Sequence, residues 1–213
     1  KISLILSTVL LFLFAFSIII LSPYKWDSSF GYKLIKESIL INNSSQAVYN
    51  YLGNSSNANI WSVYVDHISP INKNEIADGR LGSIRRCFIN KNEKGGRWDE
   101  EILFVEKNKL RRLSCFNFQD LPFNPRILNT EQIYEDKNSN CLLTFTLFSP
   151  INELSLWEKF QIHIGSYRTA YIFRKNLLNI KKDLEQTILK EFLQPLEGSS
   201  MSSAQKKAQK AKD

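Results

Sequence analysis

The chain has 213 residues, of which 43% are hydrophobic, 12% aromatic and 23% charged. This length and composition suit one core-forming domain with an appended segment, and they exclude wholesale disorder, collagen-like repeats and a barrel enzyme. Lysine and arginine total 28 against 21 aspartate and glutamate residues, so the formal net charge is +7, which favours anionic partners in general without choosing one.

An uncharged apolar segment opens the chain at residues 2–21. At ~1.5 Å per residue, a helix of that length spans the ~30 Å hydrocarbon core of a bilayer. A cleavable signal peptide is the alternative, but its apolar region covers ~7 to 15 residues and ends in small residues. Here an isoleucine-rich end leads directly to Ser22 and Pro23. We therefore predict a transmembrane helix over residues 1–22.

The charges beside this segment bear on its orientation. Lys25, Lys33 and Lys36 follow it, whereas only Lys1 precedes it, so the positive-inside rule favours a cytoplasmic position for the rest of the chain. An odd number of cysteines without a disulfide framework agrees with a reducing compartment. The prediction is a single-pass membrane protein whose globular domain faces the cytoplasm.

A short polar and aromatic stretch at residues 23–32 is predicted to be a flexible linker that keeps the domain close to the bilayer. Its aromatic side chains suit the lipid headgroup region, or else they pack on the domain. Beyond it, the alternation of residues 34–41 predicts a strand. A serine cap before an apolar stretch that ends at Gly53 predicts a short helix, and a second helical stretch reaches Trp61.

The middle of the chain reads as a series of strands separated by short turns such as Asp78-Gly79 and Gly95-Gly96. Because parallel strands need crossovers of a dozen or more residues, these connections favour an antiparallel meander. Apolar residues then recur every three or four positions from about 160 to 193, which predicts one long amphipathic helix. Residues 194–213 are small, polar and basic, so they are predicted to form a flexible tail. The predicted strands cover residues 63–68, 82–89, 97–105, 110–118, 127–134 and 141–148.

Three stretches of this region match a known family in order and spacing. The first, SILINNSSQAVYNYL at 38–52, is followed by Trp61 and looks like the opening strand, capped helix and tryptophan of that family. The second, at 78–115, contains a glycine turn and a strand of the pattern W-x-E-x-[VI]. The third, NLLNIKKDLE at 176–185, is similar to the GLxNLKxxLE helix end, with Asn176 or Leu177 in place of the leading glycine.

On these residues the chain resembles the START-like, or SRPBCC, superfamily, which includes polyketide cyclases and lipid-transfer domains. The resemblance covers about residues 33–186. It implies the α+β helix-grip fold, a curved antiparallel sheet around a long C-terminal helix, here over residues 33–193 and preceded by the transmembrane helix. That architecture leaves an elongated gap between sheet and helix, and such gaps hold apolar ligands fixed by a few polar groups.

Alternation along the predicted strands and helix selects the residues that face this gap. Glu100 stands out, because an inward carboxylate among aromatic side chains must be paired, protonated or functional. Arg85 or Arg86 on the neighbouring strand is its predicted partner. Alternatively, the aromatic side chains fill a solid core and leave no cavity. The predicted ligand-binding residues are Trp98, Glu100, Ile102, Phe104, Phe116, Phe118, Phe145, Tyr167 and Tyr171, with Leu147 and Phe173 beside them.

The segment at residues 120–128 joins two predicted strands and carries the apolar residues Leu121, Pro122 and Phe123. In this fold it lies at the cavity mouth, where it gates the cavity or touches lipid, or else it tucks its apolar side chains over the core.

Three functional hypotheses follow. The first is a membrane-tethered domain that takes a lipid or other hydrophobic small molecule from the adjacent bilayer. The second is a non-catalytic accessory subunit of a membrane protein complex. The third is a polyketide cyclase-like enzyme with His163 or Glu100 pointing into the cavity. Since neither His67 nor His163 lies in a recognisable catalytic motif, no catalytic residue is predicted.

Metal, cofactor and nucleic-acid partners are not predicted. The 3 cysteines and 2 histidines show no metal-ligand or redox spacing. The basic residues are dispersed, and no helix-turn-helix, zinc finger or aromatic RNA-binding motif is present. The expected partners are therefore the bilayer, a hydrophobic small molecule or lipid, and other subunits of a membrane complex.

Overall fold

The computed structural model describes residues 2–123 and 125–197, with the backbone alone at residues 2, 4 and 188–197. The helices are α1 (Ile2–Leu21), α2 (Ser45–Gly53), α3 (Ala58–Trp61) and α4 (Leu156–Glu197), with a 3-10 turn, η1, at Ser55–Asn57. The strands are β1 (Lys25–Asp27), β2 (Tyr32–Ile41), β3 (His67–Pro70), β4 (Ile84–Phe88), β5 (Arg97–Glu106), β6 (Leu110–Gln119), β7 (Leu128–Lys137) and β8 (Asn140–Phe148).

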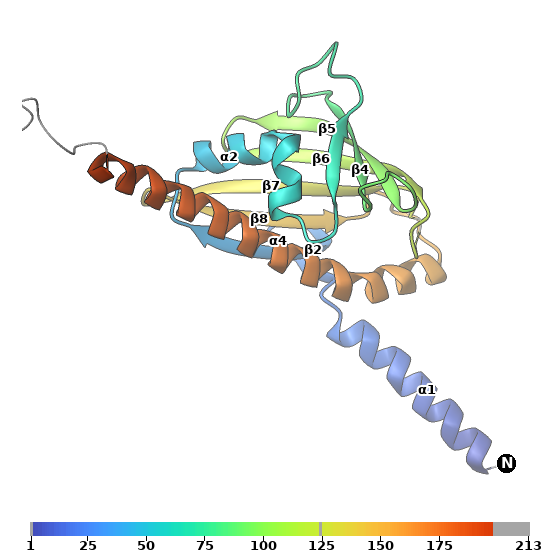
Figure 1. Cartoon of the computed structure of the whole chain (residues 1–213). Helices are drawn as coiled ribbons and strands as arrows, with labels where there is room; N and C mark the ends of the chain where they lie inside the picture. The colour runs from blue at the N-terminus through green and yellow to red at the C-terminus, as the bar shows by residue number, and fades with distance from the viewer. Residues whose placement is uncertain (1, 124, 198–213) are drawn as a thin grey trace, which may run out of the picture.

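All eight strands belong to one antiparallel sheet in the order β1-β2-β8-β7-β6-β5-β4-β3. From β3 to β8 each strand pairs with its neighbour in sequence, which confirms the predicted meander. The strand β2 then pairs with β8, so that Ile35 lies opposite Leu147 and Ile41 opposite Cys141. The long helix α4 lies along the sheet (Figure 1). The predicted α+β helix-grip architecture is therefore confirmed.

A solid core lies where the second half of α4, the helix α2 and the sheet meet. Leu177 and Ile180 of α4 are buried against Leu143 of β8 and Val48 of α2. The helix α2 begins at the predicted serine cap, since the Ser44 side chain accepts a hydrogen bond from the amide of Ala47. The buried cluster comprises Ile41, Val48, Leu52, Tyr134, Cys141, Leu143, Phe145, Leu177, Ile180 and Leu184. Because its α4 members all lie beyond position 176, the first half of α4 covers a different part of the sheet.

The helix α1 extends away from this domain (Figure 1). Its contacts with the domain are at its C-terminal end, where the Tyr167 hydroxyl donates to the carbonyl of Ile18 at 2.9 Å. The hydroxyls of Ser22 and Ser166 lie 2.9 Å apart. A helix therefore lies at the predicted position, but its predicted membrane-spanning character finds no support. Within the part of the chain that the structure describes, no helix has both the length and the apolar character needed to cross a membrane.

The prediction of a flexible linker at residues 23–32 is wrong, because this segment folds into a hairpin. The strand β1 pairs with the start of β2, with Asp27 opposite Tyr32. The amides of Phe30 and Gly31 donate to the carbonyl of Asp27, and Gly31 has the positive φ of 75° that this tight turn requires. The Asp27 carboxylate also pairs with Lys36 of β2. The sheet thus begins within a few residues of the end of α1.

The limits of α4 also differ from the prediction. The helix begins at Leu156 rather than near residue 160, because Ser155 and Glu158 form a capping box. The Ser155 hydroxyl accepts from the amide of Glu158 at 3.2 Å, and the Glu158 carboxylate accepts from the amide of Ser155 at 2.8 Å. The helix continues to Glu197, four residues into the predicted tail. Residues 198–213 of that tail lie outside the described residues.

Candidate functional site

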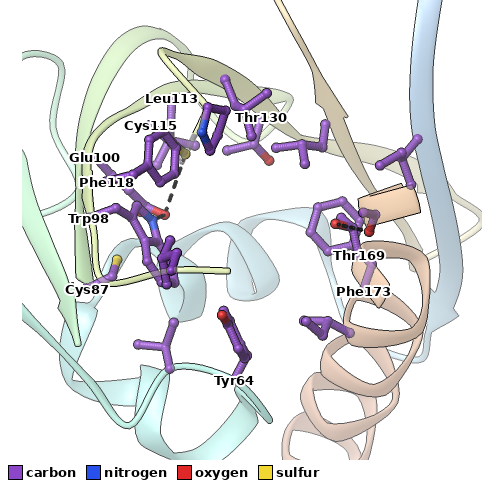
Figure 2. A pocket seen from close by; sticks show the side chains of 18 of the residues that line it. Tyr64, Cys87, Trp98, Glu100, Leu113, Cys115, Phe118, Thr130, Thr169 and Phe173 are labelled. Carbon is purple, nitrogen blue, oxygen red and sulfur yellow. Dashed lines mark hydrogen bonds between the residues drawn. The ribbon is translucent and has the colours of Figure 1, made fainter. Parts of the chain in front are cut away.

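A cavity of about 530 Å³ lies between the first half of α4 and the sheet. Ligand-binding pockets have volumes of ~300–1,000 Å³. The walls come from strands β4 to β8, from the segment around α3 and from the connection between β6 and β7. Figure 2 shows side chains of the sheet facing Tyr64 and the α4 residues Thr169 and Phe173 across this space. The alternative of a solid core without a cavity is therefore wrong.

A hydrogen-bonded cluster around Glu100 forms one wall of the cavity. The Glu100 carboxylate accepts from Arg85 Nη2 and from Trp98 Nε1, both at 3.1 Å, and from the Cys115 thiol at 3.9 Å. Figure 2 shows Glu100 beside Trp98 and Cys115. Of the two predicted partners, Arg85 is therefore the one that pairs with Glu100. The other candidate, Arg86, points to the opposite face of β4 and pairs with Asp99 at 2.7 Å.

Arg85 is only 3% exposed and remains charged. Burial lowers the pKa of its guanidinium, but the negative charge of Glu100 and further contributions from Cys87 and Asp78 outweigh that effect, so the pKa of Arg85 is raised. Its Nε has no hydrogen-bond partner among the described residues. The cavity wall therefore contains a buried ion pair with one unused donor.

Trp98, Glu100, Phe118 and Phe145 line the cavity as predicted, and so do the accompanying Leu147 and Phe173. Three predicted strand residues do not, two of them because irregularities in the pairing of β5 and β6 break the simple alternation. Ile102 is fully buried, away from the cavity. The register shifts between Ile102 and Phe104, and Phe104 is exposed. A second shift accompanies Asn117, whose φ is 53°, so that Phe118 faces inward and Phe116 does not.

Tyr167 and Tyr171 of α4 are also not part of the cavity lining. Both are exposed, Tyr167 beside α1 and Tyr171 beside the Lys175 ammonium, which lies 5.8 Å from its ring centroid. The helix instead turns another stripe to the cavity, formed by Gly165, Arg168, Thr169, Ile172, Phe173 and Asn176. At ~3.6 residues per turn, residues 167 and 171 lie on the opposite side from 165 and 169.

The segment between β6 and β7, called the rim here, is part of the cavity lining. Residues 121–123 and 125–127 line the cavity together with the start of α4. Arg126 and Glu158 form an ion pair at 3.1 Å that joins the two parts of the rim. Phe123 is 41% exposed. The rim thus combines a charged contact with an apolar side chain that reaches solvent.

Several lining residues were not predicted from the sequence. Tyr64 stacks on Trp98 with ring centroids 6.0 Å apart, and the Arg168 guanidinium lies 4.9 Å from the centroid of the Tyr64 ring. Gln132 and Asn176 also line the cavity and are nearly buried. Gln132 lies in a strand at an inward position of the alternation, so a buried polar residue there was a signal that the sequence did contain.

The two histidines lie outside the cavity. His163 is buried next to α1, edge-on to the Tyr24 ring with centroids 5.5 Å apart. Burial and the nearby charge of Lys33 lower the pKa of His163. His67 stacks on Phe88 at the surface and contacts Asp66 and Glu93. Among the described residues, no group of three or more His, Cys, Asp or Glu side chains is placed to hold a metal ion.

We expect the three cysteine thiols to resist alkylation in the folded protein. All three are free and buried. Burial raises the pKa of the Cys87 and Cys115 thiols, with a further contribution from Glu100, and burial also raises the pKa of Cys141. Because the thiolate is the reactive form, these cysteines should react slowly. Intact-protein mass spectrometry after iodoacetamide treatment should show no adduct before unfolding and three after it. Rapid labelling of native Cys87 or Cys115 would contradict their burial.

Solved structures of other proteins share this architecture. Protein TTHA0849 from Thermus thermophilus has a TM-score of 0.54 at 11% identity, over 72% of this chain and 98% of that one. Norcoclaurine synthase from Thalictrum flavum, solved with dopamine and hydroxybenzaldehyde, has a TM-score of 0.52 at 12% identity, over 72% and 87% of the two chains. DynU16, from the dynemicin biosynthetic locus, has a TM-score of 0.52 at 13% identity, over 71% of this chain and 47% of that one.

These likenesses establish the helix-grip fold, and at such identities they establish nothing beyond it. No protein-family profile and no curated protein sequence matches the chain.

Proposed function

We propose that this domain binds a hydrophobic small molecule, such as a lipid, in the cavity between α4 and the sheet, and that α1 holds the domain at a bilayer. The cavity itself carries the proposal: it has the volume of a ligand-binding pocket, and most of its lining residues are apolar or aromatic. Norcoclaurine synthase, which has the same fold, was solved with two small aromatic compounds.

The exposed side chains of α1 support the second half of the proposal. Leu11 and Phe12 are 69% and 72% exposed, and the other described side chains of the helix are almost all apolar. Leaving apolar surface in water costs about 25 cal/mol per Å², so this helix requires a covering, and lipid supplies one. Three lysines follow the helix, at positions 25, 33 and 36. In this proposal they place the domain on the cytoplasmic face.

The experiment for the cavity is native mass spectrometry of the detergent-purified full chain, paired with extraction of the same sample for lipid analysis. A stoichiometric apolar ligand is the expected result, and its mass identifies its class. A purified protein that carries no ligand, and that still binds none when total membrane lipids are added, would contradict the proposal.

The experiment for α1 compares membrane fractionation of the full chain with that of a Leu11→Lys/Phe14→Lys variant. Each lysine at the centre of a lipid-embedded helix costs about 2.5–3.5 kcal/mol, so the variant should move to the soluble fraction. Leu103→Lys/Leu178→Lys, which changes two exposed leucines of the domain, should leave the distribution unchanged. If both double variants stayed with membranes, α1 would not be the anchor.

An enzymatic role receives less support from the geometry. A general acid or base needs a free position from which to exchange a proton with substrate. The Glu100 carboxylate instead accepts from three protein donors, and neither histidine lines the cavity. A role as an accessory subunit rests on exposed apolar residues outside α1, such as Leu156 and Trp157. A protein that co-purifies with an empty domain would favour it.

A further inference from the structure

One end of the cavity presents unused hydrogen-bond donors. We infer that this end selects ligands that carry a buried carboxylate, with the apolar remainder of the ligand directed toward the rim at residues 121–127. The inference rests on the proposed function, since it names the chemical class of the ligand in the same cavity. It is carried by Gln132, Asn176 and Arg85, all of which line the cavity.

Gln132 is 9% exposed and its amide orientation is fixed by its neighbours. The side-chain oxygen accepts from Arg111 Nη1 at 2.9 Å and from the Tyr134 hydroxyl at 2.7 Å. Arginine is a donor only, so the reverse orientation of the amide would place two donors against each other. The NH₂ group is therefore directed away from Arg111, and it has no hydrogen-bond partner among the described residues. It is a donor available to a ligand.

Asn176 repeats this arrangement from α4. Its side-chain oxygen accepts from the amide of Val63 at 2.9 Å, which leaves its NH₂ group without a hydrogen-bond partner in the described part of the chain. Arg85 adds a positive charge to the cavity wall, although its unpartnered Nε is itself buried. In contrast, both oxygens of Glu100, the carboxylate on this wall, are already occupied by protein donors. A ligand group that accepts hydrogen bonds fits this end, and one that only donates does not.

The charge of Arg111 favours a carboxylate over a neutral acceptor. Arg111 is 1% exposed. Its guanidinium contacts Gln132, the Tyr134 hydroxyl, the carbonyl of Tyr49 at 3.4 Å and the Tyr49 ring at 4.3 Å. No carboxylate of the described residues lies within ion-pair distance of it. A buried cation without an anion is costly, and it polarises the Gln132 amide that lies between it and the cavity. A carboxylate bound to that amide would compensate the charge.

Both amide donors lie near the segment that includes α2 and α3. Gln132 is tied to it through Arg111 and the Tyr49 carbonyl, and Asn176 through the amide of Val63. The two amide groups are therefore both tied to this segment, and since Gln132 and Asn176 are only 9% and 6% exposed, a ligand headgroup bound to them would be desolvated.

The test compares the affinities of the detergent-purified full chain for hexadecanoic acid, its methyl ester and hexadecan-1-ol, at a pH where the acid is ionised. Hydrogen bonds to a charged group contribute about 1.5–3 kcal/mol, so the acid should bind at least about tenfold more tightly than the alcohol. In Gln132→Glu the oxygen that faces Arg111 is kept, while the donor becomes a second carboxylate oxygen. The affinity of this variant for the acid should fall by more than about tenfold, and its affinity for the alcohol should stay within about twofold.

Gln119→Glu is the matched control. Gln119 also accepts from an arginine, Arg97 Nη2 at 2.6 Å, but it lies outside the cavity lining, so its substitution should leave all three affinities unchanged. If Gln132→Glu does not fold, as judged by circular dichroism, Asn176→Asp replaces it, because its retained oxygen still accepts from Val63. Equal binding of acid and alcohol by the native chain, or an unchanged acid affinity in the folded variant, would overturn the inference. Failure of all three probes to bind would count against the proposed function itself.

Discussion

Gly165→Trp is expected to abolish binding of apolar ligands while the domain stays folded. Gly165 lies on the stripe of α4 that lines the cavity, and a Cβ added there would meet no heavy atom within 4 Å. A larger side chain at this position therefore has room to grow into the space that a ligand would occupy. An indole ring that projects into this space obstructs part of it without displacing the sheet, so a ligand that fills the cavity can no longer enter while stability should be kept.

The measurement is the affinity for a fluorescent fatty-acid analogue, together with native mass spectrometry for any co-purified ligand. Gly165→Ala is the matched control. It should retain the ligand and gain about 0.5–1 kcal/mol of stability, because glycine in a helix interior is less favourable than alanine by that amount. If Gly165→Trp retained full ligand stoichiometry, the binding site would have to lie elsewhere on the molecule.

Glu100→Leu is expected to destabilise the domain by about 3–5 kcal/mol, because it leaves the buried charge of Arg85 without its carboxylate. Arg85 and Glu100 have side chains that are 4% and 14% exposed, so water compensates little of the loss. The double variant Arg85→Met/Glu100→Leu should recover most of that stability, since apolar residues of similar volume can replace a buried ion pair at little cost. Denaturant unfolding of the detergent-solubilised chain measures both changes.

Glu106→Leu provides the comparison for this pair. Glu106 pairs with Lys109 at 2.7 Å, and both side chains are at least half exposed, so its loss should cost less than about 1 kcal/mol. A double variant no more stable than Glu100→Leu alone would show that the cost arises from packing around Trp98 rather than from the unpaired arginine.

The arrangement of strands and the long helix could be predicted from the sequence, because it depends on patterns that extend over many residues. Short turns between alternating segments specify an antiparallel meander, and the inward position of Trp98 and Glu100 follows from the same alternation. The ion pair with Arg85 was predictable too, since a carboxylate on an inward strand face requires a partner on the next strand. Each of these inferences depends only on the repeat of inward-facing residues along an element and on which strand lies next to it.

Residues whose positions depend on one local irregularity could not be predicted. Asn117 adopts a left-handed conformation that shifts the register by one residue, and a shift of one residue exchanges the two faces of a strand. This shift separates Phe116 from Phe118, and the separate shift between Ile102 and Phe104 does the same for Phe104, so simple alternation predicts the wrong face for Phe116 and Phe104. The tyrosines at 167 and 171 fit an amphipathic period equally well, but the period alone does not say which stripe of α4 meets the sheet. Only the packing of Leu177 and Ile180 sets that rotation.

The pairing of β2 with β8 has a consequence for how the chain is made. Ser38 and Thr144, whose hydroxyls lie 2.8 Å apart across this pair, are separated by 106 residues of sequence. At ~5–20 residues per second, roughly 5 to 20 s pass between synthesis of one and of the other. During that time β2 stands next to α1 without its long partner, and an unpaired strand edge invites aggregation. Completion of the sheet is therefore a late event in biosynthesis, which makes the domain dependent on protection of its first long strand until its last strand has emerged.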